Sequence, residues 1–126
     1  MRPPYAPGRR TLKSPAALPC GSPSASTLRL MVIEFLTFEV DPVERDEWLA
    51  EEERHWSRYL ESRPGFAGKE IWVDDDDPGR VHAVIRWETQ QAWDDVPGAD
   101  VKAVDEAMGE WFREAAMRAF RVVRDC

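Results

Sequence analysis

The sequence predicts an α+β fold in which the elements follow in the order strand, helix, strand, strand, helix, strand. The β-prone segment 31–40 precedes a long segment with apolar residues at helical spacing, and Pro64-Gly65 ends that helix. Two further β-prone segments flank a turn at 74–79, and a second helical pattern precedes a short closing strand. This order is that of a ferredoxin-like domain, which has a four-stranded antiparallel sheet with both helices on one face.

The chain of 126 residues is long enough for one domain with a hydrophobic core. Residues 31–126 carry the hydrophobic patterns and are predicted to form this domain. Residues 1–30 hold most of the prolines, together with serine, alanine and arginine, and show no hydrophobic periodicity. We expect them to be a disordered tail or a false N-terminal extension; their acid-free, arginine-rich composition also resembles a transit peptide.

The net charge of -7 is distributed unevenly along the chain. Residues 1–30 contain five basic residues and no acidic one, so residues 31–126 are strongly acidic. An acidic domain repels phosphate backbones, and we therefore expect no nucleic-acid partner. No apolar run approaches the roughly 20 residues that span a bilayer, so no membrane partner is expected. Cys20 and Cys126 form no disulfide framework, which fits a reducing compartment and predicts a cytoplasmic protein.

The first helix is predicted to begin at Asp41-Pro42, where Asp can cap and Pro can occupy the first turn, and to run to about residue 60. Glu52 falls in the middle of its apolar stripe, and His55 lies on the border. The stripe consists of Trp48, Leu49, Trp56, Tyr59 and Leu60.

The segments 66–73 and 80–88 are predicted to pair as a β-hairpin around the turn at 74–79. Thr89 caps a short helix at 90–95, a longer helix follows at 100–115, and 120–123 forms the closing strand. The third strand alternates between one face of Val81, Ala83, Ile85 and Trp87 and another of His82, Val84, Arg86 and Glu88.

The first strand is apolar on both sides, with one face of Ile33, Phe35 and Thr37 and another of Val32, Leu36, Phe38 and Val40. Because both helices cover the same side of the sheet, one apolar face has no partner within the chain. A patch of this kind is uncommon on a soluble monomer and usually marks an interface. We therefore expect a homodimer in which two copies pack through the open sheet face.

Two stretches carry a resemblance to a known family. One is the helix-to-strand link Arg-Pro-Gly-Phe-Ala-Gly at 63–68, and the other is the strand-to-helix run Val-Ile-Arg-Trp-Glu-Thr-Gln-Gln-Ala-Trp at 84–93. Residues 31–124 resemble the dimeric α/β-barrel superfamily, and in particular its antibiotic-biosynthesis-monooxygenase domain. Within this superfamily the chain is most similar to a group of short, uncharacterised bacterial proteins. The resemblance implies a dimeric α/β barrel and determines the architecture better than the chemistry.

The superfamily includes cofactor-free oxygenases that act on aromatic polyketides, and haem-degrading enzymes. The haem degraders use an asparagine in the first strand, a tryptophan ending the third strand and a histidine in the next helix. Trp87 matches the tryptophan, but the first strand has no asparagine and residues 90–115 have no histidine. The resemblance therefore disfavours haem degradation. Trp87 lies where the family's pocket is expected, although it is also a candidate core residue.

Glu52 is the sharpest candidate for a functional residue. A carboxylate on an apolar helix face is costly unless it is paired or protonated, and desolvation would raise its pKa toward the range of a general base. The functional interpretation is a catalytic base, or a polar anchor, in a pocket lined by Trp48, Trp56, Tyr59 and Trp87. The structural interpretation is a salt bridge to an arginine such as Arg86 or Arg121, or a solvent gap in the stripe.

No metal site or cofactor is predicted. His55 and His82 lie on different elements, and neither has the companion residues of a zinc site. The four aspartates at 74–77 lack the spacing of a calcium loop, since Ile85 occupies the position that needs glutamate. The chain also contains no glycine-rich phosphate loop or dinucleotide fingerprint.

Two hypotheses follow. The first is a homodimer that binds a small hydrophobic or aromatic molecule, with a cofactor-free, monooxygenase-like enzyme as its catalytic form. The second is a non-catalytic homodimeric binding or scaffold module of the same fold. The sequence does not decide whether the protein is an enzyme.

Overall fold

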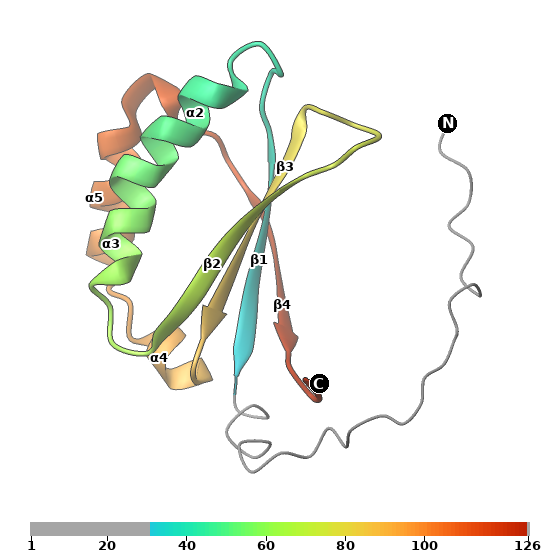
Figure 1. Cartoon of the computed structure of the whole chain (residues 1–126). Helices are drawn as coiled ribbons and strands as arrows, with labels where there is room; N and C mark the ends of the chain where they lie inside the picture. Colours follow the sequence, from blue (N-terminus) through green and yellow to red (C-terminus); the bar gives the residue numbers. More distant parts are fainter. Residues whose placement is uncertain (1–30, 126) are drawn as a thin grey trace, which may run out of the picture.

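The computed structural model describes residues 31–125 as one four-stranded sheet covered by helices on one side (Figure 1). This arrangement confirms the predicted ferredoxin-like α+β fold. The predictions for residues 1–30 lie outside the described residues. The elements are β1 (Val32–Glu39), α2 (Arg45–Glu52), the π-helical segment η2 (Glu53–Ser57), α3 (Arg58–Glu61), β2 (Phe66–Val73), β3 (Arg80–Trp87), α4 (Gln90–Asp94), α5 (Gly98–Met108), the 3-10 segment η3 (Gly109–Trp111) and β4 (Ala116–Arg121).

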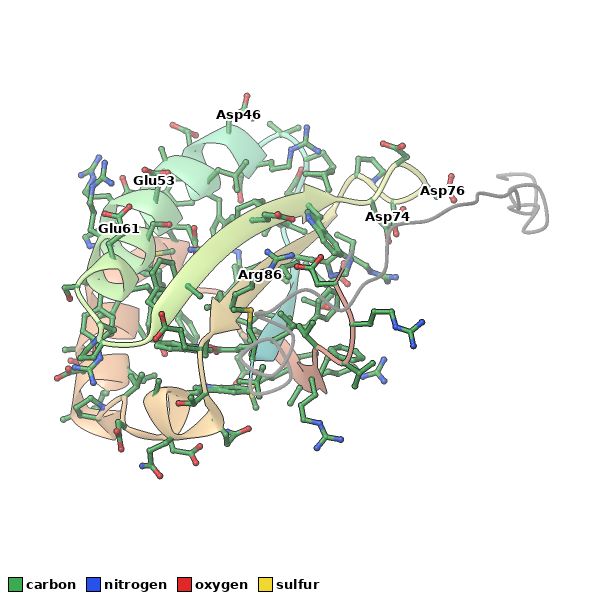
Figure 2. The ribbon with its side chains drawn as sticks, turned by 60° about the horizontal axis from the view of Figure 1, so that its bottom comes forward. Asp46, Glu53, Glu61, Asp74, Asp76 and Arg86 are labelled. Atoms are coloured by element: carbon green, nitrogen blue, oxygen red, sulfur yellow. The ribbon has the colours of Figure 1, made fainter. Side chains whose placement is uncertain are left out.

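The sheet has the strand order β2-β3-β1-β4, and all neighbouring strands are antiparallel. The continuous helix formed by α2, η2 and α3 lies beside α5 on one face, while the opposite face carries no helix among the described residues (Figure 1). Asp46, Glu53 and Glu61 lie on the side of the first helix that is turned away from the sheet (Figure 2). None of the described helices is long and apolar enough to cross a membrane.

Three predicted boundaries are wrong, each for a local reason. The first helix begins at Arg45 rather than Asp41, because the Asp41 carboxylate accepts a hydrogen bond from the Val43 amide and holds a turn. Helix α5 ends at Met108, since Gly109 adopts a positive φ of 57° at the C-cap. The closing strand occupies 116–121 instead of 120–123, and pairs with β1 along this length.

A β-bulge changes which residues of β2 face the helices. Phe66 pairs with Trp87 and Gly68 with Arg86, so β2 contains one extra residue at this point. Gly68 has a φ of 144°, a conformation that glycine adopts without a steric penalty. After the bulge, Lys69 lies opposite Ile85 and therefore faces the helices.

The core lies between the helices and the sheet. The face of β3 that carries Ala83 and Ile85 is buried at every position, with Trp87 and Val81 completely inaccessible. Trp48 of α2 is also completely buried and packs in the cluster with Val81 and Met108. Leu60 and Val32 form a second cluster around Trp87. Burial of these large apolar side chains is the main contribution to folding stability.

The link between α3 and β2 packs tightly against α4. Gly65 has a φ of 82°, and a β-carbon at this position would overlap the side chain of Ala92. The Gly65 carbonyl accepts a hydrogen bond of 2.8 Å from the Glu88 amide, which joins the link to the end of β3. Thr89 caps α4 as predicted, accepting a 3.0 Å hydrogen bond from the Ala92 amide.

Candidate functional site

A cavity of about 430 Å³ lies between the helix layer and the inner face of the sheet. Exposed residues such as Phe112 and Met117 are part of its wall, so it opens to solvent along the segment that leads into β4. Its size is in the range of pockets that bind small molecules. The wall is formed by Glu34, Leu36, Phe38, Trp48, Glu52, Trp56, Leu60, Ile85, Trp87, Trp93, Val96, Val101, Asp105, Met108, Phe112, Arg113, Glu114, Ala115 and Met117.

Four tryptophans from four different elements reach this cavity. Trp48 comes from α2, Trp56 from η2, Trp87 from the end of β3 and Trp93 from α4. The π-helical segment that carries Trp56 interrupts an otherwise regular helix, a feature that is frequent at functional sites. Trp48 and Trp87 are completely buried, while Trp56 and Trp93 are partly exposed.

The structure brings three of the four predicted pocket residues together with Glu52. Trp48, Trp56, Trp87 and Glu52 all line the cavity. Tyr59 is absent from the cavity wall that residues 31–125 form. Its ring lies edge-on to Trp56, and its hydroxyl donates a 2.6 Å hydrogen bond to Asp100. It therefore supports Trp56 from outside the cavity.

Glu52 is buried, with 4% of its surface exposed, and forms an ion pair with the Lys69 ammonium group. The expectation that its partner would be Arg86 or Arg121 is wrong, because Arg86 pairs with Glu70 on the open face. Lys69 also donates a 2.9 Å hydrogen bond to the Ser57 hydroxyl, so a second N–H group of its ammonium has an acceptor. The bulge in β2 makes this pairing possible by turning Lys69 toward the helices.

Two further carboxyl groups in the cavity accept hydrogen bonds from indole nitrogens. Trp87 Nε1 donates to Glu34 at 3.0 Å, and Trp56 Nε1 donates to Asp105 at 3.2 Å. Burial raises the pKa of the Glu34 carboxyl, while the hydrogen bond from Trp87 and the charge of Lys69 act in the opposite direction. Burial likewise raises the pKa of Asp105, opposed by the hydrogen bond from Trp56. Both groups are therefore held in an environment that disfavours their charged forms.

The sequence interpretation missed Glu34 and Asp105, although both were detectable. Glu34 stands between Val32 and Leu36 on the helix-facing side of β1, so strand alternation places it inward. Asp105 follows Val101 by four residues and precedes Met108 by three, which is the spacing of one helix face. In each case an acidic residue interrupts an apolar face, the same signal that identified Glu52.

The cavity wall also contains a buried donor. The Trp48 side chain is fully buried, and its Nε1 has no hydrogen-bond acceptor within residues 31–125. A buried N–H group without an acceptor costs free energy, so it would be stabilised by an acceptor atom placed beside it. Arg113, at the open side, donates a 3.1 Å hydrogen bond to the Glu44 carboxylate.

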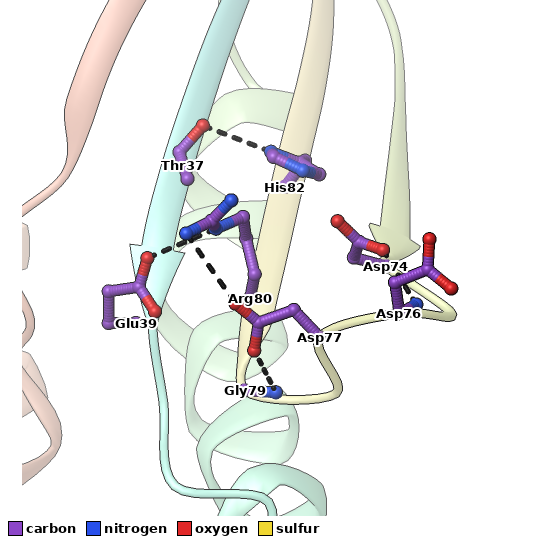
Figure 3. Close-up of polar contacts among 8 residues, drawn as sticks. All are labelled: Thr37, Glu39, Asp74, Asp76, Asp77, Gly79, Arg80 and His82. Atoms are coloured by element: carbon purple, nitrogen blue, oxygen red, sulfur yellow. Dashed lines mark hydrogen bonds and ion pairs between the residues drawn. The ribbon is translucent and has the colours of Figure 1, made fainter. Parts of the chain in front are cut away.

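His82 lies on the open face of the sheet, away from the cavity. Its Nδ1 is 3.0 Å from the Thr37 hydroxyl (Figure 3). Its ring stacks on Phe35 with centroids 4.8 Å apart. His55 is on the outer helix surface, where it pairs with Glu51 at 3.3 Å. The two histidines are therefore far from a common site, and residues 31–125 contain no cluster suited to holding a metal ion.

The aspartates at 74–77 form the predicted turn. Asp74 accepts a 2.8 Å hydrogen bond from the Asp76 amide, and Asp77 accepts one of 3.3 Å from the Gly79 amide (Figure 3). Arg80 pairs with Asp77 and with Glu39 of β1. These contacts give the carboxylates a structural role in closing the hairpin.

Comparison with solved structures shows the same fold in proteins of low sequence identity. A monooxygenase of Streptomyces coelicolor, solved with nanaomycin D, matches with a TM-score of 0.61 and 19% identity over 77% of this chain and 91% of its own. A haem degrader of Mycobacterium tuberculosis, solved with two haems in its active site, has a TM-score of 0.58 and 24% identity over 75% of this chain and 98% of its own. A cofactor-independent oxygenase of Streptomyces nogalater has a TM-score of 0.52 and 18% identity over 72% and 91%.

A search of curated proteins found no match to this sequence. The sequence profile of the antibiotic biosynthesis monooxygenase family matches residues 31–97, a segment that includes β1, the helix carrying Glu52 and the hairpin ending in Trp87. The match spans more than half of the chain and agrees with the fold. The chain therefore belongs to the antibiotic biosynthesis monooxygenase family.

Proposed function

We propose that the protein binds a small hydrophobic or aromatic molecule in the tryptophan-lined cavity. The observation that carries this proposal is the open space of about 430 Å³ surrounded by Trp48, Trp56, Trp87 and Trp93. Trp48 and Trp87 are packed core residues, whereas Trp56 and Trp93 are only partly buried, so the interior is not filled on their side of the cavity.

The catalytic form of this proposal is a cofactor-free, monooxygenase-like enzyme. Glu52 is the candidate base, which would take a proton from an acidic hydroxyl or activated C–H group of the ligand. Its carboxyl group lies in the cavity wall and is held in place by Lys69. The oxygenases of similar fold lend support at the level of architecture.

One observation favours the alternative of a non-catalytic binding or scaffold module. Glu52 and Lys69 form an ion pair, and the Ser57 hydroxyl accepts a further hydrogen bond from Lys69. A purely structural ion pair requires this pairing of both buried charges. The substitution Glu52→Gln separates the two forms. The catalytic form predicts a loss of turnover on an electron-rich aromatic substrate; unchanged affinity and turnover would exclude Glu52 as base or anchor.

We further propose that the protein is a homodimer formed through the open face of the sheet. Phe35 lies at the centre of an aromatic group on this face, with ring centroids 6.1 Å from Trp72 and 5.9 Å from Phe120. Trp72 and Phe120 are 47% and 43% exposed, which is high for large aromatics on a strand. A second copy would cover this apolar surface.

Native mass spectrometry of the protein purified from its own cells tests both parts. A dimer carrying the mass of a small molecule would support the cavity as a binding site and give the ligand's mass. An empty dimer would favour the scaffold module. A monomer at micromolar concentration would contradict the proposed packing through the sheet face.

A further inference from the structure

The charges in the cavity wall are mainly negative. Four acidic residues and one basic residue line it, namely Glu34, Glu52, Asp105, Glu114 and Arg113. Two of these charges are balanced by partners, because Glu52 pairs with Lys69 and Arg113 pairs with Glu44. The wall therefore keeps an excess of carboxyl groups beside the cavity.

Glu34 and Asp105 have no salt bridge within residues 31–125 and instead accept hydrogen bonds from tryptophans. Lys69 is the cation that acts on Glu34, and it is already bound to Glu52. Glu34 belongs to the sheet and Asp105 to α5, so carboxyl groups approach the cavity from both of its layers. An indole N–H stabilises a carboxylate only in part, and a full positive charge nearby would stabilise it further.

The tryptophans, like the carboxyl groups, favour the binding of a cation. The face of an indole ring carries a negative quadrupole and attracts cations, and Trp is the strongest of the aromatic residues in this respect. Trp56 and Trp87 direct their N–H groups, which are the positive edges of the rings, toward Asp105 and Glu34. This arrangement satisfies the polar edges of both rings. Trp87 is completely buried, so the half-buried rings of Trp56 and Trp93 are the ones that can present a face to a ligand.

We propose that the cavity selects an organic cation, namely a protonated amine or quaternary ammonium group attached to an apolar or aromatic body. The ammonium group would lie between Glu34 and Asp105, and the apolar body would contact the tryptophan wall. The same wall repels carboxylates, sulfonates and phosphates, since these would add negative charge beside its carboxyl groups. This proposal rests on the proposed small-molecule cavity and adds the charge of its ligand.

Three probes of similar shape and different charge test the proposal on the full chain. They are N,N,N-trimethylanilinium, which is a cation, tert-butylbenzene, which is neutral, and benzenesulfonate, which is an anion. Binding is followed by calorimetry and by tryptophan fluorescence at pH 7.5 and constant ionic strength. We expect the cation to bind about tenfold or more tightly than the neutral probe, and the anion not to bind.

The outcomes separate this inference from the proposed function. If tert-butylbenzene binds as tightly as the cation, or benzenesulfonate binds at all, the charge preference is overturned while the cavity remains a binding site. If none of the three probes binds, the small-molecule cavity itself is overturned, and this inference falls with it.

Substitution of Glu34 and Asp105 tests whether these two carboxyl groups cause the preference for a cation. Glu34→Gln and Asp105→Asn retain shape and a hydrogen-bond acceptor for each indole, so we expect affinity for the cation to fall by about tenfold while affinity for tert-butylbenzene stays within about twofold. Glu106→Gln is the matched control, because Glu106 neighbours Asp105 on α5 but is exposed and outside the cavity wall. Equal losses in all three variants would reveal a general effect of net charge and overturn the proposal.

Discussion

The indole nitrogen of Trp87 donates a 3.0 Å hydrogen bond to the carboxyl group of Glu34, joining the end of β3 to β1 across the inner face of the sheet. Trp87 is completely buried, and Glu34 lines the adjoining cavity. The hydrogen bond offsets only part of the desolvation cost of the Glu34 carboxylate, because burial still raises the pKa of Glu34. An acidic group retained at such a cost is more common at binding and catalytic sites than elsewhere.

This pairing predicts a pH-dependent stability. Since the pKa of Glu34 is raised in the folded state, the folded protein binds this proton more tightly than the unfolded chain. The corresponding stability is fully present below the unfolded pKa and is lost as pH rises through the folded pKa. We expect Glu34→Gln to unfold at higher urea concentration than the wild type at pH 7.5, and the difference to shrink toward pH 4. Glu106→Gln should leave the urea midpoint nearly unchanged at both pH values.

The buried ion pair predicts a large asymmetry between single and double substitutions. Lys69→Met leaves the Glu52 carboxylate buried without its partner and is expected to cost about 3–5 kcal/mol of unfolding free energy. The double variant Glu52→Gln with Lys69→Met should recover most of this loss, because no unpaired charge remains. Arg54→Met serves as the surface control, since the exposed Arg54–Glu51 pair contributes at most about 1 kcal/mol. Urea unfolding gives the unfolding free energy of each variant. If the loss in the double variant equals the sum of the losses from Glu52→Gln and Lys69→Met alone, the pair is not coupled.

The link between α3 and β2 predicts a site that accepts only glycine. Gly65→Ala combines a positive φ with overlap against Ala92, and we expect a loss of about 2–4 kcal/mol in unfolding free energy. Gly98→Ala is the control, because Gly98 begins α5 and has open space around its α-carbon. Thermal unfolding should show a large decrease in Tm for the first variant and a small change for the second. Equal changes would contradict the close packing of the link against α4.

The proposed dimer predicts an effect of charge on the open face of the sheet. Phe120→Asp places a carboxylate in the aromatic group around Phe35, so we expect the dimer to dissociate at micromolar concentration in light-scattering measurements on the full chain. Val43→Asp introduces the same charge at a residue that is 90% exposed in the turn before α2, and it should remain dimeric. A Phe120→Asp protein that stays dimeric would show that another surface mediates association.

Local patterns in the sequence were sufficient to predict the order of the elements and the faces they present. The hairpin from β2 to β3, the Thr89 cap and the division of β3 residues between two faces agree with the structure, because each depends on neighbours within a few residues along the chain. The inward position of Glu52 follows from helical periodicity in the same way. The helix ends were less predictable, since a turn at Asp41 and a left-handed glycine at Gly109 compete with helical propensity.

The composition of the site was decided by contacts between segments that are far apart in the sequence. Strict alternation from Phe66 would direct Lys69 away from the helices, and only the extra residue at the bulge turns it toward Glu52. The pairing of Trp56 with Asp105 depends on how closely α5 packs beside η2, which no local pattern encodes. The sequence by itself determined which side chains face inward wherever an element is regular, because periodicity is a property of each element alone. The tertiary structure decided which polar groups meet, since that depends on the register and distance between elements.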